Sequence, residues 1–357
     1  MTPANKPTWP RAILHLDMDA FYVNVHILDH PEDVDVPLVV GGQPDKRGVV
    51  ASASYSARQL GIRSAMPTKT AVRLCPTLKI VPVNWDRVHE KSRQVMDILQ
   101  QFGNVEQMSV DEAYVDLSAH GSPQDTAVLI RSTVKAETQL PCSVGLASSK
   151  LVAKVASDHD KPEGCTIIPP GSEAQFLAPL PTRAIWGIGP KTAEKLAQQN
   201  ITTCGHIAAA DLSALRHAVG NQAEELQERA QGIDGRSVNP DRGIAKSISQ
   251  EWTFNTDVDD PVILDEYLQK MSQRVAKSLQ KHDLVAHTVT VKIRWADFTT
   301  YTRQRSLDIG IDDGDAIYKI AQIILEEHWP RDKKLRLLGV GVSKIEKPAS
   351  RQLGFNF

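Results

Sequence analysis

The sequence predicts an α+β protein of several domains. Its 357 residues exceed what one small hydrophobic core usually organises. Strand and amphipathic helix patterns alternate over residues 11–175, and short helical patterns fill residues 176–235. The last third follows the order βαββαβ. These observations divide the chain into a sheet-based part, a helical part and a second sheet-based part.

Composition is that of an ordinary globular protein, with 41% hydrophobic and 24% charged residues and a formal net charge of −2. This charge does not indicate a nucleic-acid partner, so any basic surface must come from local patterning. The four cysteines are too widely spaced for a zinc site and predict reduced, mostly buried thiols. No apolar run is long enough to span a membrane. Residues 1–10 are polar and predict a loose arm.

The first sheet-based part begins with a short buried strand over residues 11–17 that ends on Asp17. The carboxyl end of a strand is where α/β sheets place functional groups. Met18 can lend its backbone carbonyl to a metal. The Asp-x-Asp pair of Asp17 and Asp19 also occurs in sugar-nucleotide transferases and haloacid-type phosphatases, and a surface turn is the plain alternative.

A second acidic feature is the pair Asp111 and Glu112 within SVDEAYVDLS, residues 109–118, which reads as part of a β-hairpin. Acidic residues are depleted in strands, so two in a row need a partner, and Mg²⁺ is the usual cation for carboxylate oxygens. A solvated hairpin tip is the alternative. Asp116 is interpreted as a surface residue.

Two segments supply candidate phosphate-binding groups. Strands at 38–42 and 48–53 precede a short helix on which Tyr55 and Arg58 share a face. An aromatic hydroxyl beside a guanidinium suits a phosphate chain. Residues 142–164 read as strand, turn, helix and loop, with Lys154 inside the helix and Lys161 just past it. Solvated surface is the alternative for both segments.

The helical part contains IWGIGPKTAEKL, a helix-hairpin-helix pattern with Gly187, Gly189 and Lys191. Glycines at such a turn let the backbone approach a DNA phosphate, which helix N–H groups then hold. An ordinary helical hairpin is the alternative. A hydrophilic linker follows at 236–245.

The C-terminal part predicts strands at 246–254, 287–296, 299–307 and 335–345 and helices at 261–282 and 314–328, a ferredoxin-like split. Val289, Val291, Ile293 and Trp295 are expected to face the core. We expect one basic sheet face able to lie along a phosphate backbone, with solvated charge as the alternative. Its candidate DNA-binding residues are Lys292, Arg294, Arg303, Arg305 and Arg336.

Together these motifs resemble a known family. The strings that carry the resemblance are, in order, HLDMDAFY, ASYSARQLGIRSAMP, SVDEAYVDLS, SVGLASSKLVAKVASDHDKP, WGIGPKTAEKL and RLLGVGVSKI. They resemble the Y family of translesion DNA polymerases, most closely its DNA polymerase IV class, over about residues 11–347. The resemblance implies a right-hand polymerase with a palm (11–20 and 84–175), fingers (21–83), a helical thumb (176–235) and a little finger (246–347).

The resemblance also implies roles for individual residues. Asp17, Asp111 and Glu112 match the catalytic carboxylates, with Met18 as a backbone ligand, for two Mg²⁺ ions that Mn²⁺ can replace. The positions that match nucleotide-binding residues are Phe21, Tyr22, Tyr55, Arg58 and Lys161. Tyr22 matches the steric gate that excludes a 2′-hydroxyl. The sequence departs from the family at residues 23–26, at Ser56 and at Asp160, but it keeps every catalytic acid.

The implied activity is template-directed, low-fidelity DNA synthesis past damage, by a monomer without a proofreading domain. Primer–template DNA and deoxynucleoside triphosphates are the expected substrates, and the cytoplasm, at a bacterial nucleoid, is the expected location. The tail at 348–357 resembles a sliding-clamp-binding peptide through Gln352, Leu353 and Phe355, a frayed terminus being the alternative. Two other classes compete: a non-catalytic DNA-binding adaptor and a haloacid-type phosphatase built on Asp17.

Overall fold

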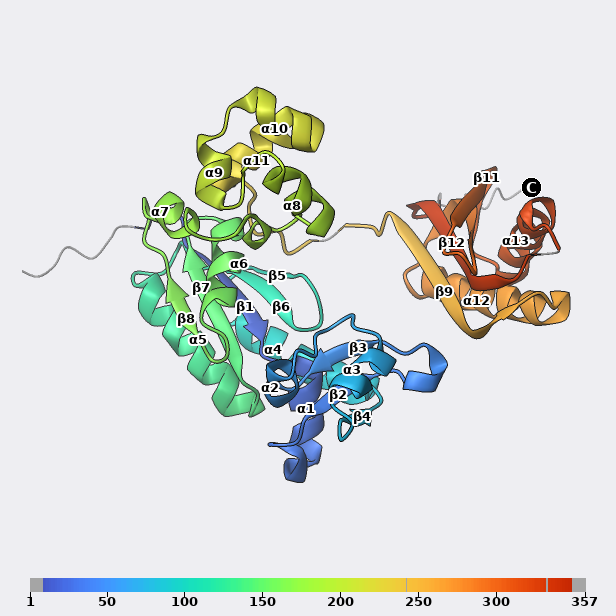
Figure 1. Cartoon of the computed structure of the whole chain (residues 1–357), viewed down its shortest axis with the longest axis horizontal. Coiled ribbons are helices and arrows are strands. Elements are labelled where there is room, and N and C mark those ends of the chain that lie inside the picture. Colours follow the sequence, from blue (N-terminus) through green and yellow to red (C-terminus); the bar gives the residue numbers. More distant parts are fainter. Residues whose placement is uncertain (1–8, 242, 332, 349–357) are drawn as a thin grey trace, which may run out of the picture. The chain divides into compact units, whose positions relative to one another are not determined.

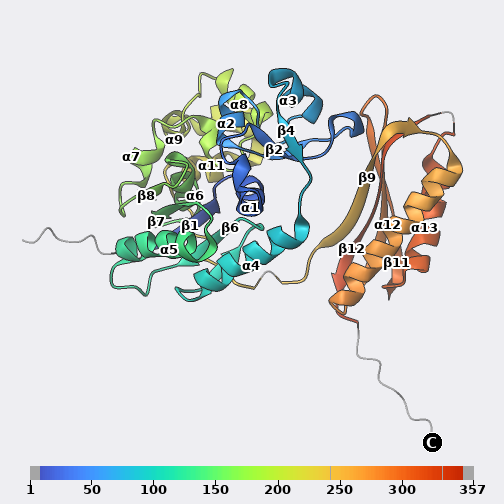
Figure 2. The same ribbon diagram turned by 90° about the horizontal axis from the view of Figure 1, so that it is seen from below.

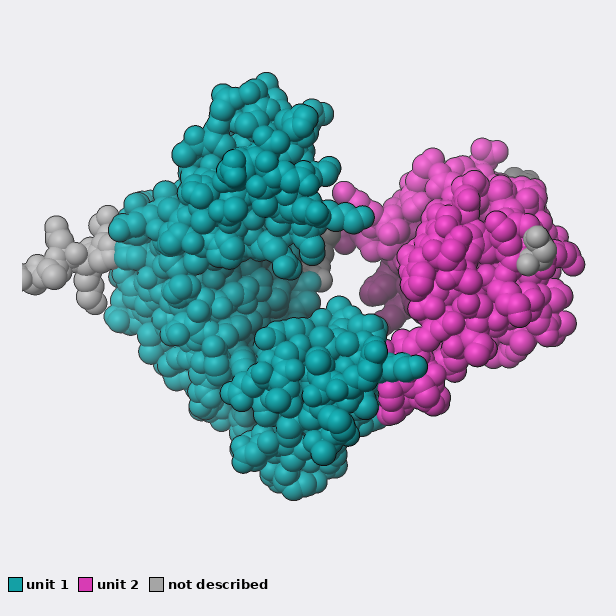
Figure 3. Space-filling view, viewed as in Figure 1, with its two compact units in different colours: residues 1–42, 49–241 teal, residues 43–48, 242–357 magenta. Residues whose placement is uncertain are grey.

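The computed structural model describes residues 9–241, 243–331 and 333–348. It forms two compact units, one of residues 1–42 and 49–241 and one of residues 43–48 and 242–357 (Figure 3). The predicted α+β class is confirmed by three sheets with helices packed against them. Across the described ranges no helix is long and apolar enough to cross a membrane.

The largest sheet of the first unit, called the central sheet here, has the strand order β5-β6-β1-β7-β8. The bounds of these strands are Val105–Gln107, Glu112–Asp116, Ile13–Met18, Cys142–Ala147 and Cys165–Ile167. β1 pairs antiparallel with both β6 and β7, so it lies in the middle. All six side chains of β1 are buried, as the short apolar run predicted.

Helices cover both faces of the central sheet. α4 (Trp85–Gln100) and α5 (Pro123–Thr138) lie on one face and α6 (Lys150–His159) on the other (Figures 1 and 2). Along β1, Leu14 and Leu16 join the core under α4 and α5. The alternate residues of β1 therefore face α6, and Asp17 is one of them.

The packing of α6 on the sheet depends on Gly145 in β7. A Cβ at this position would lie 2.2 Å from the Ala153 carbonyl oxygen and 2.4 Å from the Ser157 nitrogen, both in the α6 backbone. Any side chain here would push the helix away from the sheet. The N-terminus of α6 is capped by Ser149, whose hydroxyl accepts from the Val152 N–H.

A small lobe is inserted between β1 and α4. Its sheet has the order β3-β2-β4 and its own apolar core. Its elements are α1 (Phe21–Asp29), the 3₁₀ turn η1 (Pro31–Asp33), β2 (Leu38–Gly41), β3 (Val50–Ala53), α2 (Tyr55–Gln59), α3 (Thr68–Leu74) and β4 (Lys79–Val81). The 3₁₀ turn η2 (Pro44–Lys46) groups with the second unit.

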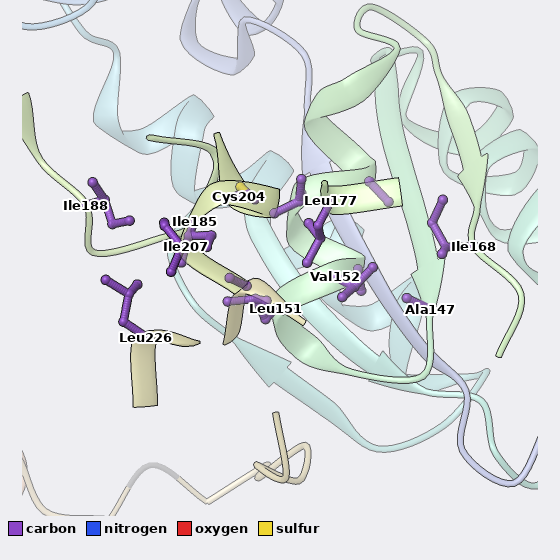
Figure 4. Close-up of a cluster of buried hydrophobic side chains, with 14 of the residues drawn as sticks. Ala147, Leu151, Val152, Ile168, Leu177, Ile185, Ile188, Cys204, Ile207 and Leu226 are labelled. Carbon is purple, nitrogen blue, oxygen red and sulfur yellow. The ribbon is translucent and has the colours of Figure 1, made fainter. Parts of the chain in front are cut away.

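Short helices follow β8, as the sequence predicted. They are α7 (Glu173–Leu177), η3 (Thr182–Ala184), α8 (Pro190–Ala197), α9 (Cys204–Ala209), α10 (Leu212–Val219), η4 (Gly220–Gln222) and α11 (Ala223–Ala230). Their core is continuous with the outer side of α6: Leu151 and Val152 share one buried cluster with Leu177, Ile207 and Leu226 (Figure 4). The predicted boundary near residue 176 therefore separates strands from short helices, but it does not separate two hydrophobic cores.

The second unit has the predicted element order. It comprises β9 (Ser247–Val258), α12 (Pro261–Lys281), β10 (Val285–Trp295), β11 (Thr300–Ile311), α13 (Gly314–His328) and β12 (Leu335–Glu346). Its sheet order is β11-β10-β12-β9, so the second and fourth strands are central. A ferredoxin-like sheet has its first and third strands there. The chain thus keeps the split βαβ connections but not that strand order.

The prediction of one basic sheet face in the second unit is wrong. Lys292 and Arg294 alternate with buried residues of β10 and lie on the face away from the helices, as predicted. Arg303 and Arg305 of β11, however, pair in register with Val291 and Val289, whose side chains are in the core. Directly opposed residues share a face, so both arginines lie on the helix side. Arg305 accordingly pairs with Glu327 of α13 at 2.9 Å.

Candidate active site

The two acidic motifs meet at one end of the central sheet. Asp17 of β1 and Glu112 of β6 are directly opposite each other in the strand register. Asp111 immediately precedes β6, and its carbonyl accepts a 3.0 Å hydrogen bond from the Met18 N–H. Strand pairing therefore brings Asp17 next to the adjacent pair Asp111 and Glu112, which follows 94 residues later in the chain.

Ser109 fixes the turn that carries Asp111. Its hydroxyl accepts from the N–H groups of Asp111 and Glu112 at 3.2 and 3.1 Å and lies 2.5 Å from an Asp111 carboxylate oxygen. Burial raises the pKa of Asp111, an effect that the Ser109 hydrogen bond only partly offsets. The acidic pair is thus a structured turn at the sheet end.

Lys154 of α6 lies between two of the acids. Its Nζ is 2.8 Å from an Asp17 oxygen and 2.8 Å from a Glu112 oxygen. Burial favours the neutral amine, but the surrounding carboxylates, Asp17 first, raise the pKa of Lys154 and keep it charged. An ammonium group therefore bridges the facing carboxylates of β1 and β6.

Lys161 pairs with the other oxygen of Asp17, at 2.6 Å. Burial alone would raise the pKa of Asp17, but Lys154 and Lys161 together hold it well below its usual range. Burial, and then the hydrogen bond with Asp17, raise the pKa of Glu112 to about 7. The two neighbouring acids thus differ in their tendency to ionise, because the lysines crowd around Asp17.

The donor set fits a hard divalent cation, which prefers carboxylate and carbonyl oxygens. The Met18 side chain is buried in the core, so only its backbone is available as a ligand. Within residues 9–241, 243–331 and 333–348, no three His, Cys, Asp or Glu side chains are gathered in a metal-holding arrangement as they stand. At the acids the reason is visible, since Lys154 occupies the position of a cation between Asp17 and Glu112.

Two candidate phosphate-binding residues lie together on α2, as predicted. The Arg58 guanidinium stacks on the Tyr55 ring, 4.8 Å from its centroid, and its Nε donates to the Ala53 carbonyl at 3.0 Å. The Tyr55 hydroxyl donates to Asp19 at 3.3 Å, just past the end of β1. The α2 face therefore turns toward the strand end that carries the acids.

The candidate steric gate, Tyr22, is half-buried near the acids. Its ring contacts the edge of Trp85, with centroids 6.0 Å apart. Burial raises the pKa of Tyr22, and the nearby charge of Asp111 adds to this effect. Phe21 differs: its side chain is buried in the core, so only its backbone can meet a nucleotide. Phe21 therefore stays a predicted nucleotide-binding residue through its backbone alone.

The hairpin with the candidate DNA-binding glycines has the expected backbone. Gly187 has φ +98°, in the left-handed region that favours glycine. Gly189 is the N-cap of α8, whose first residue is Pro190. Lys191 is exposed in the first turn of the helix. This arrangement leaves the first N–H groups of α8 accessible to an anion.

The sequence did not predict the places of three polar residues in the site. It predicts Lys154 as a candidate phosphate-binding group but not as a partner of the acids, Asp19 only as half of an Asp-x-Asp pair, and no role for His15. A signal existed for Asp19 and His15, since they are two residues either side of Asp17 and so lie on the same face of the strand. The His15 Nδ1 lies 2.7 Å from the Ser157 hydroxyl of α6.

Comparisons with known proteins identify the family. Models of the impB/mucB/samB family, its helix-hairpin-helix motif and its C-terminal domain match residues 16–158, 170–201 and 245–355. DNA polymerase IV of Dehalococcoides mccartyi strain CBDB1 is 41% identical over 95% of this chain and 88% of its own length. DNA polymerase IV of Halorhodospira halophila is 40% identical over 97% of this chain and 98% of its own length.

Solved structures give the same result. A chimeric Y-family DNA polymerase superposes with a TM-score of 0.85 over 94% of this chain and 99% of its own, at 26% identity. DinB of Sulfolobus solfataricus superposes with a TM-score of 0.65 over 93% of this chain and 98% of its own, also at 26% identity. These likenesses cover both units of the chain.

The fold is that of a nucleotidyl-transferring polymerase of the right-hand type. The chain belongs to the Y family of DNA polymerases, in its DNA polymerase IV group. It is a DNA-directed DNA polymerase of the translesion type, and the family depends on divalent metal. The phosphatase interpretation of Asp17 is therefore wrong.

The bridge made by Lys154 can be tested by replacing it. We expect Lys154→Met to destabilise the metal-free protein by about 2–4 kcal/mol, because two facing, largely buried carboxylates lose their counter-ion. Mg²⁺ should then raise the melting temperature of the variant more than that of the wild type, since a divalent ion can replace the lost charge. Thermal unfolding in chelator and in Mg²⁺ measures both quantities.

Lys270→Met serves as the control, because Lys270 forms an exposed pair with Glu266 in the second unit. It should change neither the metal-free melting temperature nor the response to Mg²⁺. Equal behaviour of Lys154→Met and the wild type under both conditions would show that the bridge does not stabilise the site.

Proposed function

We propose that this polymerase adds deoxynucleotides to a primer 3′-hydroxyl at the site formed by Asp17, Asp111 and Glu112, with two Mg²⁺ ions that Mn²⁺ can replace. The observation that carries the proposal is the meeting of these three carboxylates, from two strands, at one sheet end. When bound there, divalent ions supply the charge that activates the attacking hydroxyl and neutralises the leaving pyrophosphate.

The protein's own groups bind and orient. Asp17 stays ionised because Lys154 and Lys161 hold its pKa low, so it is ready to bind a cation. Lys161 and Arg58 would attract the triphosphate, Arg58 through a two-pronged guanidinium. Positioning and charge neutralisation dominate phosphoryl-type transfer, in which little covalent work falls to side chains. This set of groups is sufficient for that task.

The catalytic role of the acids is tested by removing them. We expect Asp111→Ala and Glu112→Ala each to reduce primer extension by at least about 10³-fold, because the transition state loses metal-mediated charge stabilisation. Affinity for primer–template DNA should stay within a few-fold of wild type. Gel-resolved extension with deoxynucleotides and Mg²⁺, on undamaged and lesion-containing templates, gives the rates.

Asp116→Asn is the matched control, because Asp116 lies on the same strand as Glu112 and its carboxylate accepts from the N–H and the hydroxyl of Ser118. Its extension rate should be near wild type. Normal extension by either acid variant would overturn the assignment.

The role of the hairpin in DNA binding is tested by Lys191→Ala in the same DNA-binding assay. We expect weaker binding with a shallower dependence on salt concentration.

We propose Tyr22 as the group that excludes ribonucleotides. Its half-buried ring is held against Trp85, near Asp111. Tyr22→Ala should raise the ratio of ribonucleotide to deoxyribonucleotide incorporation by about 10²-fold or more, because a ring-sized space opens beside the sugar. Single-nucleotide incorporation with each sugar measures this ratio.

Tyr22→Phe keeps the ring and should retain discrimination. If Tyr22→Ala selected sugars as strictly as the wild type, the gate would have to lie elsewhere.

The register of β11 changes which residues of the second unit we propose as DNA contacts. Lys292, Arg294 and Arg336 remain proposed contacts. Arg294 and Arg336 lie near each other, since the pKa of Arg336 is lowered first by burial and then by nearby arginines that include Arg294. Lys292 pairs with Glu251 at 2.8 Å, so DNA would compete with that carboxylate. Arg303 and Arg305 could meet DNA only from the helix side of β11.

We also propose that the C-terminal tail binds a sliding clamp. The support is its sequence, since Gln352, Leu353 and Phe355 lie outside the described residues. Deleting residues 352–357 should remove the stimulation of synthesis by a clamp and leave basal extension unchanged. Primer extension with and without the loaded clamp measures this, and an equal loss in both reactions would contradict the proposal.

A cytoplasmic location at the nucleoid stays a prediction.

A further inference from the structure

Asp19 is a buried carboxylate whose place in the site differs from that of the three catalytic acids. It follows β1, and only 1% of it is exposed. Its oxygens lie 3.0 Å from the Ser143 hydroxyl of β7, and one of them accepts from the Glu163 N–H at 2.8 Å. The Tyr55 hydroxyl of α2 donates to the other oxygen at 3.3 Å. Three separate segments thus converge on one carboxylate.

A buried carboxylate is costly unless hydrogen bonds satisfy it. Here burial raises the pKa of Asp19, and the bonds from Glu163 and Ser143 work in the opposite direction. One Asp19 oxygen accepts from a backbone N–H that the fold fixes, whereas each oxygen of Asp17 meets the end of a lysine side chain. Asp19 is therefore a poorer candidate for a metal ligand than Asp17. Its bonds must be explained by what they hold in place.

Two of the three segments carry candidate triphosphate-binding groups. Glu163 is two residues after Lys161, and the next N–H, of Gly164, donates to the Ser143 hydroxyl at 3.1 Å. The loop that presents Lys161 is therefore fastened twice to the ends of β1 and β7. The other segment is α2, which carries Tyr55 with Arg58 stacked on its ring.

We propose that Asp19 is a positioning residue for the incoming nucleotide. One Asp19 oxygen holds Tyr55 of α2, and the other holds the loop that carries Lys161. Both segments can then present their triphosphate-binding side chains to the same nucleotide. The long 3.3 Å bond lets the single Tyr55 proton turn to a phosphate oxygen while the ring stays in place. Such preorganisation lowers the entropic cost of binding the nucleotide. This inference rests on the nucleotide-binding roles proposed for Tyr55 and Lys161.

The test uses the full-length protein in single-nucleotide incorporation on a primer–template. Asp19→Asn keeps the shape but replaces one acceptor oxygen with an NH₂ group, so at least one of the bonds is lost. We expect KM for the deoxynucleotide to rise about tenfold or more, from the loss of charge-assisted hydrogen bonds. The value of kcat should change less than about threefold, and affinity for DNA should not change.

Two double variants separate positioning from a general loss of stability. Tyr55→Phe and Lys161→Ala should each raise KM. In at least one of the two double variants that also carry Asp19→Asn, the fold-increase in KM should be smaller than the product of the fold-increases of the two single variants. The reason is that both substitutions act on the same interaction. Full multiplicativity in both double variants would overturn the proposal, as would an unchanged KM for Asp19→Asn.

Thr138→Val is the matched control for stability. Thr138 is fully buried in the same unit, and its hydroxyl donates to the Val134 carbonyl and accepts from the Leu140 N–H, with no link to Tyr55 or Lys161. It should lower the melting temperature without raising KM. If it raised KM as much as Asp19→Asn, positioning would be refuted. Absence of any incorporation by the wild type would instead refute the proposed function itself.

Discussion

The ammonium of Lys154, held between Asp17 and Glu112, is the interaction on which the candidate site depends. Two carboxylates that face each other across paired strands, both largely out of water, repel unless a cation lies between them. That cation comes from α6, so α6 must lie directly on the sheet. Gly145 permits this approach, and the outer side of α6 packs into the core of the short helices. The acids, the sheet and the helical part are therefore one packing unit.

This arrangement also explains how one site can hold negative charge before and after its substrates arrive. Lys154 and Lys161 balance Asp17 in the protein alone. Under the proposed function, divalent cations and a triphosphate would bring charges of both signs, so the lysines would turn from carboxylate to phosphate with little net change in local charge. The same groups would then stabilise the site with and without its substrates, because the same electrostatic requirement applies to both states.

The second unit uses a simpler constraint. Its core fills one face of a four-stranded sheet under α12 and α13, and no described helix of this unit packs on the other face, called the open face here. Lys292 and Arg294 reach that open face only because they alternate with core residues of β10. On the neighbouring edge strand, the register puts Arg303 and Arg305 over the helices, where Glu327 neutralises one of them. Basic residues on neighbouring strands form one charged surface only where the strand register puts their side chains on the same face of the sheet.

The sequence did not predict α1, α3, β4, β8 or the separate helices of the helical part. By itself it determined the α+β class, the element order of the second unit, the strands that carry the acids, and the acids at residues 17, 111 and 112, because local periodicity and motif strings encode these features directly. The hairpin around Gly187 belongs with them, since a left-handed backbone position favours glycine. Only the tertiary structure decided that Lys154 bridges the acids, that Asp19 joins three segments, and that Phe21 turns into the core. Periodicity tells which residues of a strand share a face, but it does not tell which element covers that face or which residue lies opposite. Those depend on pairing between segments far apart in the chain, and that pairing is where the site is made.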